Sequence, residues 1–146
     1  MKAEIIGDGC HVPKQVIAMA RRFKGTENIC LITDAMRAAG TDFTESYLGE
    51  VLPENRVIIE AGVAKLPDRS FYAGSIATMD RVFKNAVLNV GLSIEDTSAM
   101  MSKTPANIVG AGAYKGVLDI GYDADFLVID KNMEVEKVYV RGDCKK

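Results

Sequence analysis

The strongest constraint on the fold is a run of four consecutive apolar residues at positions 29–32. Such a run without alternation is typical of a strand covered on both faces, as in a parallel sheet. A second strand is expected at residues 3–6. Between the two, apolar residues recur at helical spacing from Val16 to Phe23 and stop before Gly25. Strand, helix and strand in this order form a βαβ unit, which requires parallel strands. The sequence therefore predicts an α/β protein.

The rest of the chain carries further helix and strand signals, namely apolar periodicity and residues that start or stop helices. In chain order, we expect a hairpin at 57–65, a helix at 79–90, a helix capped by Ser93, a short helix with Thr104 as N-cap and Pro105 as first residue, and strands at 126–129 and 138–140. Because strands follow helices at the end of the chain, we divide it into residues 1–115 and 116–146.

Composition excludes several classes of function. With 146 residues the chain has about the length of one domain. Its net charge is −2 and it has no long run of basic residues, so nucleic acid is not an expected partner. No apolar run approaches the roughly 20 residues of a membrane helix, and the start lacks the apolar stretch of a signal peptide. We therefore expect no membrane partner and a cytoplasmic location.

Metal-binding residue types are scarce. The three cysteines are widely spaced and form no Cys-x-x-Cys pair, so we expect neither a disulfide framework nor a thiolate metal site. His11 is the single histidine, and most catalytic zinc sites use two or more. This chain is not expected to hold a catalytic metal by itself.

Polar residues follow both predicted parallel strands at the point where each strand ends. Asp8 and His11 follow the first strand, and Asp34 follows the second. The carboxyl ends of parallel strands meet at one rim, where α/β proteins bind ligands. An aspartate there can take a proton from water or ligate a metal, and a histidine can donate to a phosphate or carbonyl oxygen. The structural alternatives are Asp34 as a helix N-cap, His11 as a turn residue and Asp8-Gly9 as an ordinary turn.

These residues and several later motifs resemble, in order, the N-acetylglucosamine-6-phosphate deacetylases of the amidohydrolase superfamily. The similarity extends from about residue 3 to residue 143 and is carried by Asp8-Gly9-Cys10-His11-Val12, Leu31-Ile32-Thr33-Asp34-Ala35-Met36, Ala73-Gly74-Ser75, Thr78-Met79-Asp80, Pro105-Ala106 and Gly121-Tyr122-Asp123-Ala124-Asp125-Phe126. The resemblance implies the C-terminal part of a (β/α)8 barrel, strands 7 and 8 with their helices, in residues 1–115. Residues 116–146 match the terminal strands of a small β domain.

The resemblance also implies roles for individual residues. Asp34 matches the catalytic aspartate, which activates the hydrolytic water and then protonates the departing amine, and Asp34 could also be a secondary metal ligand. Tyr72 stands where the family usually has an aliphatic residue, and Ser70 where glycine is usual. The substrate-binding positions implied are Asp8, Gly9, Cys10, His11, Tyr72, Ala73 and Gly74.

In this family the metal ligands, a glutamate and two histidines, and the first six barrel strands lie upstream of the matching segment. The full-length enzyme is thus expected to use a divalent metal, zinc or similar, which this chain alone does not bind. We expect a C-terminal fragment that is inactive alone. Its expected partners are an amino-sugar phosphate and either a second copy or the missing N-terminal portion, which would cover its open strand edges.

Two other interpretations stay open. The chain could be a fragment of another amidohydrolase, such as a dipeptidase or deaminase, or a non-catalytic α/β interaction module. A nucleotide-binding domain is less favoured, because the sequence has no Gly-x-Gly-x-x-Gly or Walker-type loop.

Overall fold

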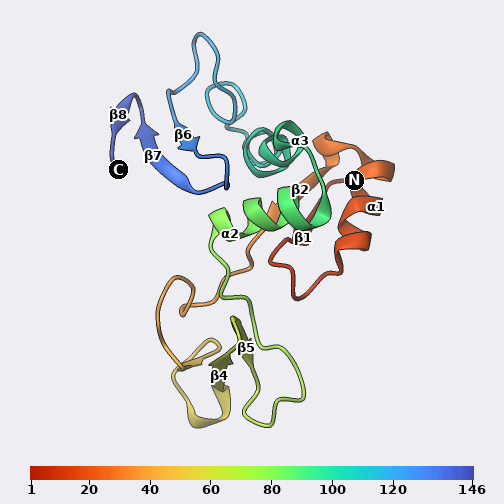
Figure 1. Cartoon of the computed structure of the whole chain (residues 1–146), viewed down its shortest axis with the longest axis vertical. Coiled ribbons are helices and arrows are strands. Elements are labelled where there is room, and N and C mark those ends of the chain that lie inside the picture. The colour runs from red at the N-terminus through yellow and green to blue at the C-terminus, as the bar shows by residue number, and fades with distance from the viewer.

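The computed structural model describes all 146 residues. Figure 1 shows a central part in which helices lie against two strands, with a small three-stranded sheet on either side of it. Two short 3-10 helices, Thr26–Asn28 and Pro53–Asn55, lead directly into strands.

The central part contains the predicted strand–helix–strand unit. Strands β1 (Ala3–Ile6) and β2 (Ile29–Ile32) pair in parallel, and helix α1 (Lys14–Lys24) connects them. The helix ends at Gly25, whose φ of 74° is readily adopted only by glycine. The first three residues of β2 are buried, so the prediction of a covered parallel strand is confirmed.

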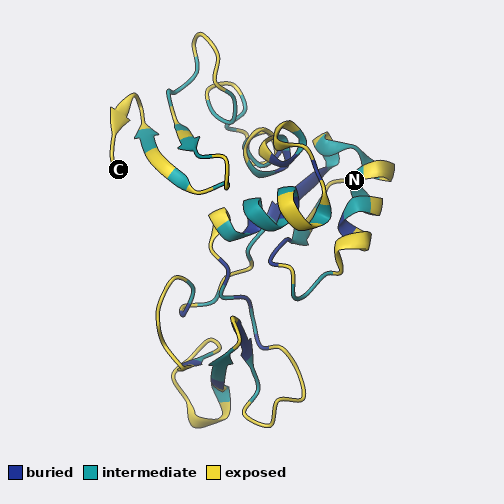
Figure 2. Cartoon of the chain, in the orientation of Figure 1, coloured by how far each residue is buried: buried dark blue, intermediate teal, exposed yellow.

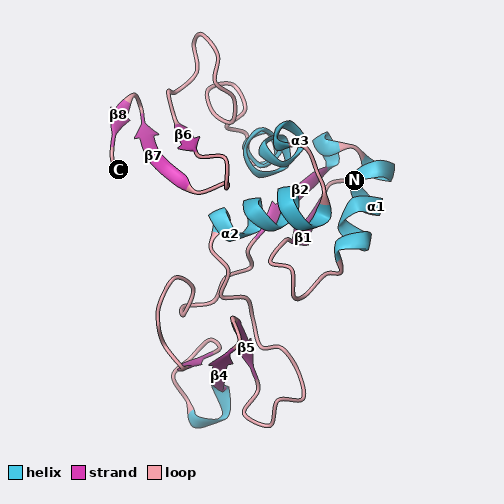
Figure 3. Ribbon diagram, viewed as in Figure 1, coloured by secondary structure: helices cyan, strands magenta, loops and turns pink.

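Two helical segments pack on this pair of strands (Figure 3). They are composed of α2 (Met79–Lys84) with a π-helical segment (Asn85–Val90), and of α3 (Ile94–Ser98), a π-helical segment (Ala99–Lys103) and α4 (Thr104–Ile108). Ser93 caps α3 as predicted, because its hydroxyl accepts a hydrogen bond from the Asp96 amide at 3.0 Å. None of the helices combines the length and apolar character needed to cross a membrane.

The prediction that a separate helix starts at Thr104 is wrong. Lys103 already has helical φ and ψ angles, so the helix continues through Thr104 without a break. The Thr104 hydroxyl instead donates to the carbonyl oxygen of Thr26 at 2.8 Å. Pro105 has no N–H for the helical ladder, and it lies two residues beyond the π-helical segment, where that ladder is already altered.

The unit that projects from the central part is an antiparallel sheet. It contains β3 (Glu45–Tyr47), β4 (Arg56–Glu60) and β5 (Val63–Lys65) in that order. The predicted hairpin is confirmed, and its turn residues Ala61 and Gly62 have φ angles of 52° and 77°, as a tight hairpin turn requires. Strand β3, only three residues long, was not predicted.

The last sheet contains β6 (Phe126–Ile129), β7 (Val135–Val140) and β8 (Asp143–Cys144). Both predicted strands are present, and the second begins three residues earlier than expected because its start pairs with the end of β6. The rings of Phe126 and Tyr139 stack across the pair at 4.4 Å between centroids. The boundary at residue 116 falls in a stretch without helix or strand and stays a prediction.

Buried residues, dark blue in Figure 2, lie in the central part and in the projecting unit, and buried apolar side chains form one cluster in each. The larger one has eight buried residues from the central part, and the smaller one has Val57, Ala64 and Ala73 of the projecting unit. The chain exposes 9031 Å², whereas a compact protein of this mass exposes about 7,300 Å². The excess indicates an open arrangement with surfaces that the chain does not cover itself.

Candidate functional site

The predicted rim is formed where β1 and β2 end. Ile6 lies opposite Ile32, and the Gly7 amide extends the ladder by donating to the Ile32 carbonyl oxygen at 2.9 Å. Asp8 and Asp34 each lie two residues beyond the end of their strand, so the two chain segments that carry them leave the sheet at the same edge. The expected rim is therefore present.

Asp34 does not cap a helix. Ala35, the next residue, forms a parallel bridge with Ser75, and the chain then makes a turn at residues 37–40 instead of a helix. The interpretation of Asp34 as an N-cap is therefore wrong. Asp34 is exposed and has a φ of 48°, an uncommon conformation for a residue other than glycine. Its role in chemistry stays a prediction.

Asp8 and His11 form a tight pair in the loop after β1. One carboxylate oxygen, Oδ2, lies 2.7 Å from His11 Nδ1. The other, Oδ1, accepts hydrogen bonds from the amides of Cys10 at 2.9 Å and His11 at 3.0 Å. Burial by itself would raise the pKa of Asp8, but the backbone amides of His11 and Cys10, together with the imidazole, lower the pKa below its ordinary value. Asp8 thus stays ionised at neutral pH and orders the loop.

Two residues of the α2 helical segment hold this loop in place. The Asn85 side-chain amide donates to the Gly7 carbonyl oxygen at 2.9 Å, and the Arg81 guanidinium donates to the Gly62 carbonyl oxygen at 2.9 Å and to Cys10 Sγ at 3.6 Å. Burial, followed by the Asp8 charge, raises the pKa of the Cys10 thiol, although Arg81 opposes the change. Sequence reasoning missed both residues, because nothing in the local pattern signals a contact so distant along the chain.

Gly9 is required by the same loop. Its φ is 83°, and a Cβ atom at this position would lie 3.0 Å from Asn85 Oδ1. A side chain here would therefore combine backbone strain with a close contact.

The second predicted substrate-binding stretch approaches the first through Tyr72. The rings of His11 and Tyr72 lie 5.5 Å apart between centroids and are tilted by 58°. Ala73 is buried and its amide donates to the Ala64 carbonyl oxygen at 2.9 Å. Gly74 has a φ of 90°, and a Cβ atom there would lie 3.3 Å from Leu48 Cδ1. The structure places Tyr72 beside His11. Ala73 and Gly74 fix the path of the backbone that follows Tyr72.

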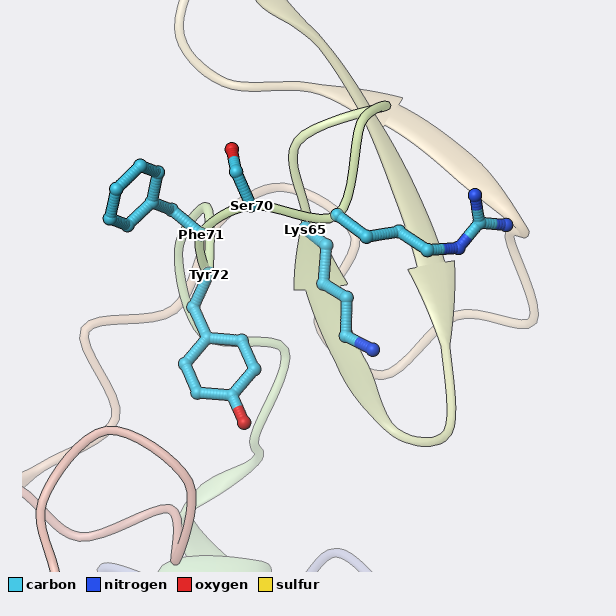
Figure 4. Close-up of a pocket in the computed structure, with 5 residues that line it drawn as sticks. Lys65, Ser70, Phe71 and Tyr72 are labelled. Carbon is cyan, nitrogen blue, oxygen red and sulfur yellow. The ribbon is translucent and has the colours of Figure 1, made fainter.

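Tyr72 also lines a cavity of about 410 Å³, whose other lining residues are Lys65, Arg69, Ser70 and Phe71. Figure 4 shows the side chains of Lys65 and Tyr72 extending to the same side, whereas Phe71 points away from them. Glu60 pairs with both cations, at 3.1 Å from Lys65 Nζ and 3.0 Å from Arg69 Nε. The cavity wall is therefore polar but largely neutralised.

A metal site is not complete within this chain. No group of three or more His, Cys, Asp or Glu side chains is placed so that it could hold a metal ion. Asp34 is the candidate donor at the rim, and a single donor does not make the four-coordinate site typical of zinc. The residues present do not fit a resident metal without ligands from elsewhere.

Comparison with known proteins identifies the class. The model of the amidohydrolase family matches residues 2–144, and the chain belongs to this family. A curated relative from Lysinibacillus sphaericus, N-acetylglucosamine-6-phosphate deacetylase, is 37% identical over 142 residues, which are 97% of this chain and 35% of the relative. The human deacetylase of the same name is 31% identical over 95% of this chain and 33% of its own length.

Solved structures give the same result. N-acetylglucosamine-6-phosphate deacetylase from Pasteurella multocida superposes on 99% of this chain with a TM-score of 0.87 and 28% identity. The Mycobacterium smegmatis enzyme superposes on 100% of it with a TM-score of 0.85 and 32% identity. An aspartate-to-alanine variant of that enzyme, in complex with N-acetyl-D-glucosamine 6-phosphate, superposes with a TM-score of 0.84. These matches confirm the predicted fold class, part of a TIM-like barrel with a small β domain.

The chain spans about a third of the length of these proteins, 35% of the Lysinibacillus relative and 37% of the Pasteurella structure. The resemblance inferred from the motifs is therefore confirmed, together with its partial extent.

Proposed function

We propose that this chain is the C-terminal part of a metal-dependent hydrolase that deacetylates N-acetylglucosamine 6-phosphate to glucosamine 6-phosphate and acetate. The main support is a combination of two observations. The chain matches deacetylases over nearly its whole length, and it carries Asp34, Asp8 and His11 at the rim where β1 and β2 end. A cytoplasmic location stays a prediction.

Asp34 has the chemistry that amide hydrolysis needs. The reaction requires a base that takes a proton from the attacking water and an acid that protonates the poor leaving amine. A single carboxylate can perform both transfers in sequence. Asp34 is exposed at the rim and is free to meet a substrate, in contrast to Asp8, which is buried and committed to His11.

The remaining predicted residues would bind the sugar phosphate. We assign His11 to a substrate oxygen, of the phosphate or the acetyl carbonyl, and Tyr72 to the neighbouring wall, since the two rings are only 5.5 Å apart. Cys10, Gly9, Ala73 and Gly74 contribute mainly backbone, which can approach a ligand closely where no large side chain intervenes.

Amidohydrolases generally use a divalent metal, which polarises the scissile carbonyl and lowers the pKa of a bound water. Because this chain cannot complete such a site, we assign the principal ligands to protein outside it. We expect the isolated chain to show neither tight zinc binding nor turnover of N-acetylglucosamine 6-phosphate.

The parallel pair has an unpaired edge on each outer side, and the exposed area exceeds that of a compact protein. We propose that the upstream part of the enzyme covers these edges and that a second copy can contribute further contacts.

A chimaera tests the proposal. The matching third of the Lysinibacillus relative is replaced by this chain, and release of acetate from N-acetylglucosamine 6-phosphate is measured. Asp34→Asn in the chimaera should lower kcat by about 10²- to 10⁴-fold, the usual effect of removing a general acid–base group. Asp68→Asn, at an exposed turn where Asp68 pairs only with Ser70, should have no effect. A folded but inactive chimaera, or an Asp34→Asn variant with full activity, would contradict the proposal.

A non-catalytic interaction module is the second candidate, and the open strand edges favour it. Size-exclusion chromatography with light scattering separates the two, because a module should form a stable assembly without metal or upstream protein. Activity of the same chimaera on a dipeptide or a nucleobase, with none on the acetylated sugar, would instead indicate another amidohydrolase reaction.

A further inference from the structure

The pairing of Asp8 with His11 has a specific chemical consequence. We propose that Asp8 is a positioning residue that holds the His11 imidazole with its proton on Nδ1, so that Nε2 is the ring nitrogen left to meet the substrate. The identity of that substrate rests on the proposed function, whereas the position of the proton does not.

The geometry allows only one arrangement of the proton. An ionised carboxylate accepts hydrogen bonds but cannot donate them, so a contact of 2.7 Å between Asp8 Oδ2 and His11 Nδ1 requires a hydrogen on Nδ1. The Asp8 side chain is 3% exposed and that of His11 is 20% exposed, so water competes little for this contact. The lowered pKa of Asp8 agrees with an ionised partner.

The carboxylate is itself held in place. Its second oxygen, Oδ1, accepts two amide hydrogen bonds, and the loop is anchored by Asn85 and allowed by the positive φ of Gly9. If Asp8 only formed the turn, Oδ1 alone would be sufficient. The additional contact from Oδ2 to the ring is what distinguishes a positioning residue from a turn residue.

The consequence for recognition concerns Nε2. A hydrogen bond at one ring nitrogen decides which nitrogen carries the proton of a neutral imidazole. With Nδ1 occupied, neutral His11 offers Nε2 as an acceptor, for example to a sugar hydroxyl. When the ring is protonated, Nε2–H becomes a donor to an anionic oxygen, and the carboxylate 2.7 Å away balances the new charge. Tyr72 packs against the same ring and restricts its rotation.

The chain offers a direct test, because His11 is its only histidine and its ring signals need no assignment by mutation. Long-range ¹H–¹⁵N correlation spectra of the ¹⁵N-labelled 146-residue chain, recorded at about pH 9, where imidazole is ordinarily neutral, report which nitrogen is protonated. We expect Nδ1–H as the major form. In Asp8→Asn we expect the major form to change to Nε2–H.

Asp130→Asn is the matched control. Asp130 Oδ1 also accepts two backbone amides, from Asn132 and Glu134 at 2.8 Å each, but it contacts no histidine. This variant should leave the His11 spectrum unchanged.

A wild-type spectrum with Nε2–H as the major form would overturn the inference, and so would a folded Asp8→Asn variant that keeps the wild-type spectrum. If Asp8→Asn is unfolded by circular dichroism, the wild-type spectrum alone decides. A chimaera without deacetylase activity, combined with the expected Nδ1–H form, would refute the proposed function and leave the role of Asp8 intact.

Discussion

Thr97 gives a prediction in which a mutation should stabilise the chain. Its side chain is fully buried, at 0% exposure, and its hydroxyl has no hydrogen-bond partner. A buried polar group without a partner costs about 1–3 kcal/mol of stability. Valine has nearly the same shape and helix propensity as threonine. Thr97→Val should therefore stabilise the chain by about 1–3 kcal/mol.

Thr104→Val is the matched comparison. Thr104 is also buried, at 3% exposure, and also lies in a helix, but its hydroxyl donates to the Thr26 carbonyl oxygen at 2.8 Å. The same substitution here removes a made hydrogen bond, while the Thr26 carbonyl oxygen keeps the hydrogen bond from the Ile29 amide. It should therefore destabilise the chain by about 0.5–1.5 kcal/mol. The same chemical change should thus raise the free energy of unfolding at Thr97 and lower it at Thr104.

Urea unfolding followed by circular dichroism measures both effects. With an m-value of about 2 kcal/mol/M, each 1 kcal/mol moves the midpoint by about 0.5 M. The m-value should stay constant, since neither change alters the surface exposed on unfolding. A lower midpoint for Thr97→Val, or an unchanged one for Thr104→Val, would refute the reasoning from hydrogen-bond partners.

Three further predictions concern the rim. The lowered pKa of Asp8 means that its contribution to stability is fully present above the unfolded-state pKa of about 3.9 and is lost as pH falls through the lower folded-state pKa. In urea titrations between about pH 5 and pH 2, Asp8→Asn should therefore lose less stability than wild type, and parallel curves would contradict this. Gly9→Ala should destabilise the chain by about 1–2 kcal/mol, because φ is 83° and the new Cβ meets Asn85, and equal unfolding midpoints would show the loop to be tolerant. Adding equimolar zinc should leave the melting temperature unchanged, as no ligand cluster is present, and a clear increase would reveal a site.

The parts of the fold that could be predicted are those with a strong local signal. The buried run of β2, the helix stop at Gly25 and the Ser93 cap each depend on neighbours in sequence, and all three are confirmed. The rim followed from them, because parallel pairing alone brings the ends of β1 and β2 together.

The parts that could not be predicted depend on contacts between distant residues. Strand β3 is too short for a periodic pattern and exists because it pairs with β4. Thr104-Pro105 has the composition of a helix start, yet the bond from Thr104 to Thr26 and the preceding π-helical turn keep the helix continuous. Arg81 and Asn85 belong to the site only because they contact the loop after β1, which is distant from them in the sequence.

The division of the buried residues into a cluster of eight and a cluster of three also bears on motion. His11 follows β1, whose Ile5 packs against the larger cluster, whereas Tyr72 precedes Ala73 of the smaller one. Segments held by fewer buried contacts open more often than the rest of a protein, so amide exchange should be faster around Tyr72 than along β2. We therefore expect the part of the site that carries His11 to be more rigid than the neighbouring wall formed by Tyr72. A change that restrains Tyr72 in its bound position should then raise the affinity for a ligand, because less conformational freedom is lost on binding.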